Sequence, residues 1–393
     1  MPKTFKNLYP SIYDFENLYF AYLKARRSKR YRSEVLEFTS NLEENLLQLQ
    51  NELIWRTYRT GRYREFYVHD PKTRLVMALP FRDRVVHHAL VAVIEPIFER
   101  RFIFDSYACR PGKGTHAGAN RVTFFLKKLT RLHGRVYCLK ADISKYFPSI
   151  NHRILKELIR KKIVCPGTLW LIDEIIGSAA DPSNPDPKGI PIGNLTSQLF
   201  ANIYLHELDI FVKHTLKARY YVRYMDDFVL LSPNKDELWE YKREIQVFLA
   251  DRLNLALNGK TSVFPISQGI DFLGYRIWPT HRLLRKNSIK RMKRKLKIFR
   301  KKYSEGRITM DRINASIQSW LGHCKHANTY NLRQKLLGEF TLKRGDPDGH
   351  GNAGGPPDPF GAPSRQVGSQ PGAPGTKDWP SGTDTGCHNG GSK

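Results

Sequence analysis

Cysteine, long apolar runs and acidic residues are all scarce in this chain of 393 residues. Its five cysteines are scattered and form no C-x-x-C pair, which argues against a zinc ribbon and a disulfide framework and indicates a reducing compartment. No apolar run reaches the length of a membrane span, and no signal-peptide pattern is present. We therefore expect a cytoplasmic protein that does not bind membranes.

The shortage of acids leaves a strongly basic chain. Lysine and arginine number 65 against 37 aspartates and glutamates, a formal net charge of +28. A positive excess of this size indicates a polyanionic partner, and nucleic acid is the default candidate.

Composition also separates the last segment from the rest. Residues 345–393 hold 13 glycines and 8 prolines among 49 positions. Such a segment cannot bury a core, so we expect disorder. The preceding part carries 62 of the basic residues against 32 acids, so the charge excess belongs to the folded portion.

Two adjacent acids interrupt a β-branched and aromatic run in the middle of the chain. The run Tyr220–Leu231 contains Asp226 and Asp227 and predicts two short buried strands joined at the acids. An isolated Asp-Asp pair is most often an ordinary turn. Two desolvated carboxylates become tolerable, however, where a divalent cation is held between them.

A second strand-like run lies upstream. Residues 136–141 are followed directly by Asp142, which would supply another ligand from an adjacent strand. Taken alone, Asp142 is equally a strand-end acid or a helix cap. Together with Asp226 and Asp227 it forms an oxygen-only set that suits Mg²⁺, or Mn²⁺, rather than Zn²⁺. Two such ions a few ångströms apart serve in-line phosphoryl transfer.

These motifs resemble those of a known family. Tyr224-Met225-Asp226-Asp227, with Asp142 in an Asp-x-x-x-Tyr-Phe setting, resembles the palm of reverse transcriptases, over residues of about 20 to 340. The segment 189–198 has Ile192 before Gly193 and Gln198 after a serine. This pattern resembles the reverse transcriptases of diversity-generating retroelements, as do residues 82–88 and 107–116.

The resemblance implies an α+β right-hand polymerase. We expect an N-terminal region and fingers at 1–135, a split β-α-β palm at 136–278 with fingers elements interleaved, a helical thumb at 279–344 and a disordered tail at 345–393. Periodicity independently predicts helices over 34–54, 84–101, 196–216 and 238–253, and a hairpin over 62–80 that turns at residues 70–72. A thumb helix capped by Ser288 and a second around Ile313–Leu321 complete the expected elements.

The resemblance also implies roles for individual residues. Asp142, Asp226 and Asp227 would be catalytic and bind metal with the Ile143 carbonyl, and Lys260 would be the proton donor. Groups around the nucleotide would be Arg74, Ile143, Ser144, Lys145, Tyr146, Phe147, Ile192, Gly193 and Gln198, with Phe147 excluding a ribose 2′-hydroxyl. The primer grip would be Phe272, Leu273 and Gly274. Contacts to the nucleic-acid backbone would come from Lys113, Lys290, Arg291, Lys293, Arg294 and Lys297. By its own composition, the basic stretch 24–32 is equally a backbone-binding arm for RNA or a solvated charged face.

The function implied is RNA-directed DNA synthesis with two Mg²⁺ ions. For the subgroup, the resemblance implies error-prone cDNA, mutated at template adenines, copied from a template-repeat RNA to diversify a target gene of a bacterium or phage. Implied partners are the template RNA, the RNA/DNA duplex, dNTPs and a small, oligomeric, basic accessory protein. Two alternatives stay open: a group II intron-like or retron/defence-type reverse transcriptase, and a non-catalytic RNA-binding protein on a polymerase scaffold.

Overall fold

A computed structural model describes residues 3–69, 73–181 and 183–344. The expected tail at 345–393 and the expected turn at 70–72 lie outside the described residues. Among the described residues, no helix is both long and apolar enough to cross a bilayer.

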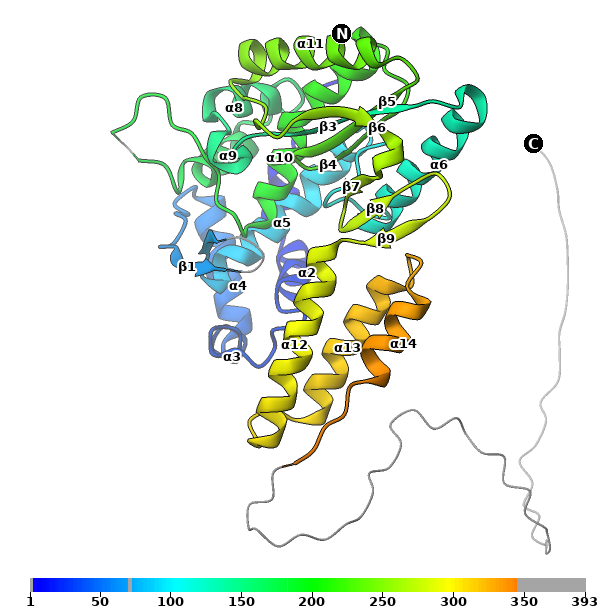
Figure 1. Cartoon of the computed structure of the whole chain (residues 1–393). Helices are drawn as coiled ribbons and strands as arrows, with labels where there is room; N and C mark the ends of the chain where they lie inside the picture. The colour runs from blue at the N-terminus through cyan, green and yellow to red at the C-terminus, as the bar shows by residue number, and fades with distance from the viewer. Residues whose placement is uncertain (1–2, 70–72, 182, 345–393) are drawn as a thin grey trace, which may run out of the picture. The chain divides into compact units, whose positions relative to one another are not determined.

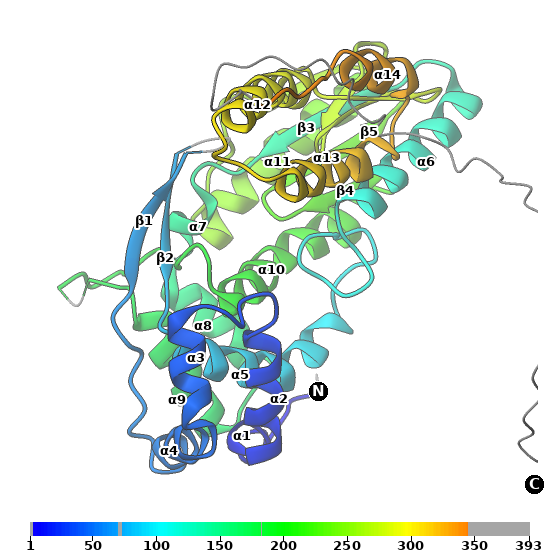
Figure 2. The ribbon, with the colours of Figure 1, turned by 90° about the horizontal axis from the view of Figure 1, so that it is seen from below.

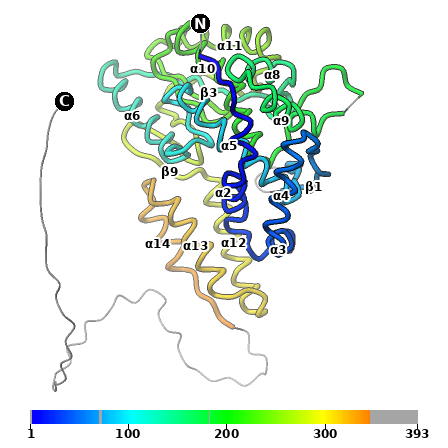
Figure 3. Tube along the Cα trace, turned by 180° about the vertical axis from the view of Figure 1, so that it is seen from behind, coloured from blue at the N-terminus to red at the C-terminus, as the bar shows by residue number. Residues whose placement is uncertain are grey.

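The N-terminal part is a helical layer packed on one long helix. Helices α1 (Tyr9–Tyr13), α2 (Phe15–Ala25), α3 (Ser33–Ser40) and α4 (Leu42–Ile54) gather beside α5 (Phe81–Glu99), as Figure 3 shows from behind. The single helix predicted over 34–54 is wrong, because Asn41 leaves the helical conformation (φ −122°, ψ 52°) and separates α3 from α4. The apolar positions are still buried on both sides of the break, so the periodicity located the core face correctly.

The predicted hairpin is confirmed as β1 (Arg64–Val68) and β2 (Arg74–Ala78), which pair antiparallel from Arg64↔Ala78 to Val68↔Arg74. Figure 2 shows the two strands as a separate ribbon. All five residues of β1 are exposed. A ribbon with so little buried surface is marginally stable by itself, so its position depends on where β2 contacts the rest of the chain.

The central sheet has four antiparallel strands in the order β4-β5-β3-β6 (Figure 1). They are β3 (Tyr137–Asp142), β4 (Tyr221–Tyr224), β5 (Asp227–Ser232) and β6 (Ser262–Pro265). Both faces of the sheet are covered. Leu139 and Phe228 join one core with α10 (Leu195–Ile210) and α11 (Lys235–Leu253), while Cys138 and Val229 join another with α6 (Thr115–His133). Apolar residues therefore occupy both faces of β3 and β5, as expected of strands buried on two sides.

Short helices complete this region: α7 (Tyr146–Ser149), α8 (His152–Arg160) and α9 (Pro166–Gly177). The helices predicted over 84–101 and 238–253 are confirmed as α5 and α11. The one predicted over 196–216 is confirmed as α10, whose last turn continues as a π-helical segment at Phe211–Thr215.

A small second sheet follows the central one. After the 3₁₀ turn η2 (Ile266–Gln268), strands β7 (Ile270–Phe272), β8 (Tyr275–Ile277) and β9 (Arg282–Leu284) pair antiparallel in that order. The expected palm–thumb boundary at 278/279 falls between β8 and β9, so one sheet contributes to both proposed domains.

Three C-terminal helices form a bundle, visible side by side in Figure 1. They are α12 (Lys286–Ser304), α13 (Met310–Cys324) and α14 (Tyr330–Gly338), and their core includes Met292, Phe299 and Ile317. The prediction of Ser288 as an N-cap is wrong, because α12 begins two residues earlier, after Arg285. The whole arrangement is a mixed α+β fold of the right-hand polymerase type.

A buried ion pair connects the central sheet to α10. Arg223 of β4 and Asp209 of α10 are both fully buried, and the guanidinium donates to both carboxylate oxygens at 2.7 and 2.6 Å. Tyr221 donates to the same carboxylate, and Arg223 also donates to the carbonyl of Met225 at 3.1 Å. The pair thus fixes the turn that follows β4.

We predict that Asp209→Ala lowers the free energy of unfolding by about 3–5 kcal/mol, because a charged guanidinium would be left buried without its partner. Chemical denaturation measures this loss. The matched control is Glu157→Ala, which removes the exposed i,i+4 partner of Arg153 and is expected to cost about 0.5 kcal/mol or less. Equal, small losses in both variants would show that the buried pair does not hold the fold.

Candidate active site

Three carboxylates meet where the central strands end. Asp142 is the last residue of β3 and Asp227 the first of β5, and the two are direct partners in the ladder. Directly opposed residues of an antiparallel pair share one face, so both side chains lie on the same side of the sheet. Asp226 sits in the two-residue turn between Tyr224 and Asp227, where Met225 has a left-handed backbone (φ 56°). The prediction of a hairpin is confirmed, although only Asp226 lies in its turn.

The environment disfavours the charged form of two of these acids. Burial raises the pKa of Asp226, and so do the charge and hydrogen bonding of Asp142, while Arg74 opposes the shift. Burial is also the main reason that the pKa of Asp227 is raised to about 7, with Lys140 opposing it from 3.8 Å. One oxygen of Asp227 is buried and has no hydrogen-bond partner.

This cluster of oxygen donors fits a divalent cation. Negative charge is concentrated in a desolvated place, and a cation would relieve the repulsion between Asp142 and Asp226. Within the described ranges, no three Asp, Glu, His or Cys side chains are already gathered as a complete metal-binding group. Asp142 and Asp226 are the close pair, whereas Asp227 faces Lys140. The residues therefore offer two carboxylate ligands, and further oxygens would have to come from the backbone, substrate or water.

Asn258 is a site residue that the sequence reasoning missed. Its amide donates to a carboxylate oxygen of Asp142 at 3.3 Å, and its backbone N–H donates to the carbonyl of Asp142 at 2.7 Å. The Asn-Gly pair at 258–259 signalled only a turn. The proposed proton donor Lys260 is exposed, and its backbone N–H donates to the Asn258 side chain. No contact in the described structure places the Lys260 ammonium at the acids.

Of the residues that follow Asp142, some are buried in the core and others lie at the site. The side chains of Ile143 and Tyr146 are buried, and the Tyr146 hydroxyl donates to the carbonyl of Ala201. The backbone N–H of Ser144 donates to the carbonyl of Ala256 at 2.9 Å. The role of residues 143–147 at a nucleotide stays a prediction. Lys145 is exposed with a left-handed backbone, and Phe147 is half-buried. The half-buried Phe147 ring is therefore the segment's aromatic candidate for contact with a nucleotide.

The loop before α10, at residues 189–194, docks on strand β2 of the β1–β2 hairpin. The carbonyl of Ile192 accepts a hydrogen bond from the N–H of Met77 at 3.2 Å. Gly193 has φ 126°, and a Cβ there would meet Val76 and Met77 at 3.2–3.3 Å. A side chain at position 193 would thus push the loop away from β2, whereas Ile192 keeps a partly exposed side chain. Arg74, at the start of β2, is close enough to Asp226 to lower its pKa.

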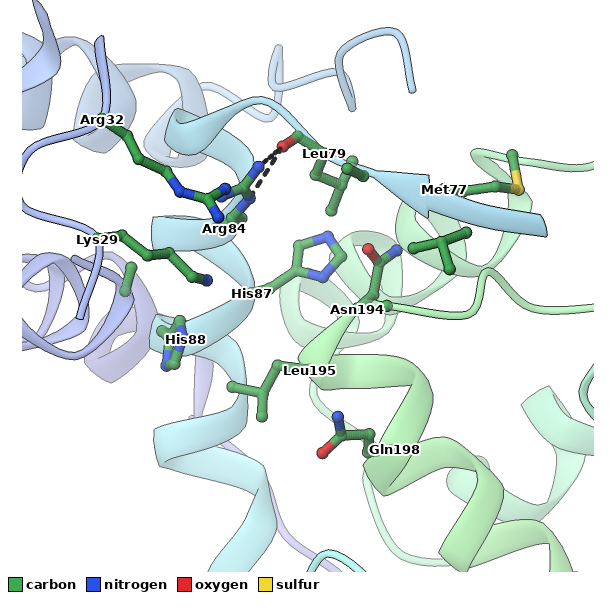
Figure 4. A pocket seen from close by; sticks show the side chains of 14 residues that line it. Lys29, Arg32, Met77, Leu79, Arg84, His87, His88, Asn194, Leu195 and Gln198 are labelled. Atoms are coloured by element: carbon green, nitrogen blue, oxygen red, sulfur yellow. Dashed lines mark hydrogen bonds between the residues drawn. The ribbon is translucent and has the colours of Figure 1, made fainter. Parts of the chain in front are cut away.

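Gln198 lines a cationic cavity of about 310 Å³ (Figure 4). Lys29, Arg32 and Arg84 face the start of α10 across it, and no acid is among the described residues that line it. Asn194 makes no side-chain cap, so α10 presents an uncapped, positive N-terminus.

His87 stands in the same cavity. Its Nδ1 is 2.9 Å from the Thr196 hydroxyl, and its buried Nε2 has no partner. Burial lowers the pKa of His87 to about 3, so the ring is neutral. Cations, a helix N-terminus and an unpaired ring nitrogen together make this cavity suitable for an anion.

The other proposed nucleic-acid contacts are placed as follows. Phe272, Leu273 and Gly274 form the end and turn of the β7–β8 hairpin. The thumb cations Lys290, Arg291, Lys293, Arg294 and Lys297 lie exposed on α12. Lys113 differs from the expectation, because its ammonium donates to the carbonyl of Phe104 at 2.9 Å and lies 3.4 Å from that ring. These contacts occupy the ammonium within the protein.

Comparison with known proteins identifies the family of the chain. The family model described as "Reverse transcriptase (RNA-dependent DNA polymerase)" matches residues 69–277, which include the three acids and the central sheet. The chain therefore belongs to the reverse transcriptases, which are RNA-directed DNA polymerases.

Two curated relatives extend the match. Protein YkfC of Escherichia coli (strain K12) is 28% identical over 287 residues, which cover 63% of this chain and 74% of that protein. The group II intron-encoded protein LtrA of Lactococcus lactis subsp. cremoris is 24% identical over 362 residues, covering 74% of this chain and 59% of LtrA. Among solved structures, the apo telomerase from Candida tropicalis truncated from its C-terminal domain is similar over 58% of this chain and 55% of that chain, with a TM-score of 0.43 and 15% identity.

We predict that Mg²⁺ stabilises the protein through Asp142 and Asp226. At ten times its dissociation constant the ion should add about 1.4 kcal/mol to the free energy of unfolding. In the double variant Asp142→Asn/Asp226→Asn the gain should vanish, and the metal-free protein should be more stable than wild type because the repulsion is removed. Thermal unfolding with and without Mg²⁺ measures both effects. An equal gain from Mg²⁺ in both proteins would place the ion elsewhere.

Proposed function

We propose that this chain copies RNA into DNA at the cluster formed by Asp142, Asp226 and Asp227. The observation that carries the proposal is the pair Asp142 and Asp226, which come from separate parts of the sequence and meet in a desolvated place, where the charge of Asp142 raises the pKa of Asp226. Family membership supplies the reaction class, and the net charge of +28 fits a nucleic-acid substrate.

The residues around the cluster have complementary tasks in this proposal. Asp142 and Asp226 would hold two Mg²⁺ ions, which would supply the charge stabilisation that phosphoryl transfer needs. Asn258 orients Asp142, and Lys140 holds Asp227 beside the pair. Arg74 binds the triphosphate from the fingers hairpin, and the Phe147 ring excludes a ribose 2′-hydroxyl. Asp227 as a third ligand, the Ile143 carbonyl as a ligand and Lys260 as an acid remain predictions.

The cationic cavity suits the template strand in this proposal. Its lining joins Lys29 and Arg32 of the basic stretch 24–32 to Gln198 in the first turn of α10, which follows directly on the loop that docks on β2. A phosphodiester group would be bound by Lys29 and Arg32 together with the uncapped first turn of α10, since Arg84 is already paired with Glu34. The template RNA, the RNA/DNA duplex and dNTPs are then the ligands of one continuous site.

We further propose that the cDNA is error-prone. Ile192 and Gln198 support membership of the diversity-generating subgroup, whose enzymes mutate opposite template adenines and work with a basic, oligomeric accessory protein. Physically, Ile192 offers only apolar contact where a glutamine would hydrogen-bond. Losing such a bond weakens discrimination between correct and incorrect base-pair geometry. Each loss of about 1.4 kcal/mol in the difference between the two transition-state free energies lowers the selectivity tenfold.

One alternative has a specific observation in its favour. The similarity to LtrA, a group II intron-encoded protein, fits an intron-type enzyme with faithful cDNA synthesis. The retron-type reading and the non-catalytic RNA-binding scaffold are further outcomes of the tests below.

Primer extension on an RNA template with dNTPs and Mg²⁺ tests the reaction. We expect cDNA from wild type and a loss of at least about a thousandfold for Asp142→Asn or Asp226→Asn, because several kcal/mol of metal-dependent charge stabilisation disappear. The control is Asp251→Asn, an exposed acid near the end of α11, which should keep full activity. Absence of cDNA from wild type, with RNA binding retained, would favour the non-catalytic scaffold.

Sequencing the products tests the error-prone role. On an adenine-containing template, wild type should concentrate errors opposite adenine, and Ile192→Gln should reduce them roughly tenfold by restoring a polar contact. Ile192→Leu is the matched control and should leave the error rate unchanged. Equally faithful cDNA from all three proteins, with the neighbouring accessory protein included, would support the intron-type or retron-type reading.

A further inference from the structure

The turn between β7 and β8 is clamped from two sides. Leu273 and Gly274 both have positive φ (53° and 87°), as a two-residue hairpin of this type requires. The Leu273 side chain packs so closely on Gly118 of α6 that a Cβ there would lie 2.8 Å from it. A Cβ at Gly274 would meet the ring of His323 at 3.3 Å. The position of the turn is therefore set by α6 on one side and by α13 on the other.

The hydroxyl of Tyr275 connects the same three elements. Tyr275 follows the turn directly and is fully buried. Its oxygen lies 3.0 Å from Nδ1 of His116, near the start of α6, and 2.9 Å from Nδ1 of His323 in α13. It is also 3.0 Å from the carbonyl of His323, and the two rings stack at 4.5 Å. One hydroxyl thus joins the hairpin, the palm-side helix and the thumb.

The surroundings of this contact are cationic or neutral. His326, two residues after the end of α13, stacks on His116 at 3.7 Å, and Arg282 of β9 lies 5.3 Å from the Tyr275 ring. Burial raises the pKa of Tyr275 to about 12 and that of the neighbouring Cys324 to about 11, so both are neutral. In the described parts of the chain, none of the three histidines forms an ion pair with a carboxylate. A proton added to this group would meet Arg282 and no compensating acid.

We propose that Tyr275, His116 and His323 are positioning residues that lock the Leu273–Gly274 turn to α13 and so hold the thumb on the primer strand. The proposal rests on the proposed function, because it takes this turn as the primer grip. It goes further by assigning the residues that couple the grip to the thumb. It also makes retention of the duplex depend on the histidines being neutral.

The sign of this dependence follows from the pKa values. Burial, then His326 and Arg282, lower the pKa of His116, and burial, then His116, lowers that of His323. An open state with ordinary histidine values near 6.5 would bind more protons than the locked one. The lock is therefore fully stable above about pH 6.5 and weakens as the pH falls below it.

The test measures how fast a fluorescent template–primer dissociates, by anisotropy, and how far one binding event extends the primer in the presence of a heparin trap. For wild type we expect dissociation about three- to tenfold faster at pH 6.0 than at pH 7.5, with shorter products. His116→Gln/His323→Gln should dissociate equally slowly at both values, because glutamine can hydrogen-bond but cannot gain this proton. Tyr275→Phe should dissociate several-fold faster at both.

The control is His133→Gln, an exposed histidine at the end of the same helix α6, which should keep the wild-type pH response. A glutamine double variant with the full wild-type pH response would overturn the proposal, as would Tyr275→Phe dissociating at the wild-type rate. If thermal unfolding shows that Tyr275→Phe is not folded, the pH response of the glutamine double variant still tests the proposal. Dissociation is read without catalysis, so a wild-type protein that binds but makes no cDNA counts against the proposed function alone.

Discussion

The position of the β4–β5 hairpin depends on one desolvated ion pair. Arg223 and Asp209 have no contact with water, and the guanidinium reaches past the carboxylate to the carbonyl of Met225, beside the acids. Backbone bonds from Asp105 and Tyr107 hold the same arginine from the other side. A buried pair is weak evidence for net stability, but it disfavours any other position of β4, since a slip would leave two charges unpaired. The turn that contains Met225 and Asp226 is therefore held in one position by the same ion pair.

The surface of the molecule is basic, whereas acidic side chains gather at its centre. The exterior carries the basic excess, including the exposed cations of α12, whereas the centre gathers acids whose pKa values are raised by burial. Both features cost folding free energy, through self-repulsion outside and desolvation inside. A polyanion and divalent cations would offset the two costs together, which is why substrate and metal are expected to bind cooperatively.

Much of this arrangement could be predicted from the sequence, because strong local patterns carried it. The apolar, β-branched and aromatic runs around Asp142 and around Asp226 located β3, β4 and β5, and helical spacing located α5, α11 and α12. The errors arose where a single residue's conformation overrode the pattern, as at Asn41, or where a helix began without the expected cap, as at Ser288. The roles of Asn258 and of the Ser144 amide could not be predicted, since each depends on a partner more than a hundred residues away in the sequence. The roles of the site residues remain predictions.

The fold alone does not choose between a mutagenic enzyme and a faithful one, because both would need the same acids, hairpin and thumb. The distinction rests on side chains that vary while the backbone stays fixed. Ile192 is such a position: its carbonyl is bound to Met77 and the next residue, Gly193, has a conformation and a close contact that only glycine accommodates. An exchange of isoleucine for glutamine would change the chemistry offered to a base pair without moving the loop. In the proposal of error-prone synthesis, selectivity at Ile192 is therefore separable from catalysis at the acids.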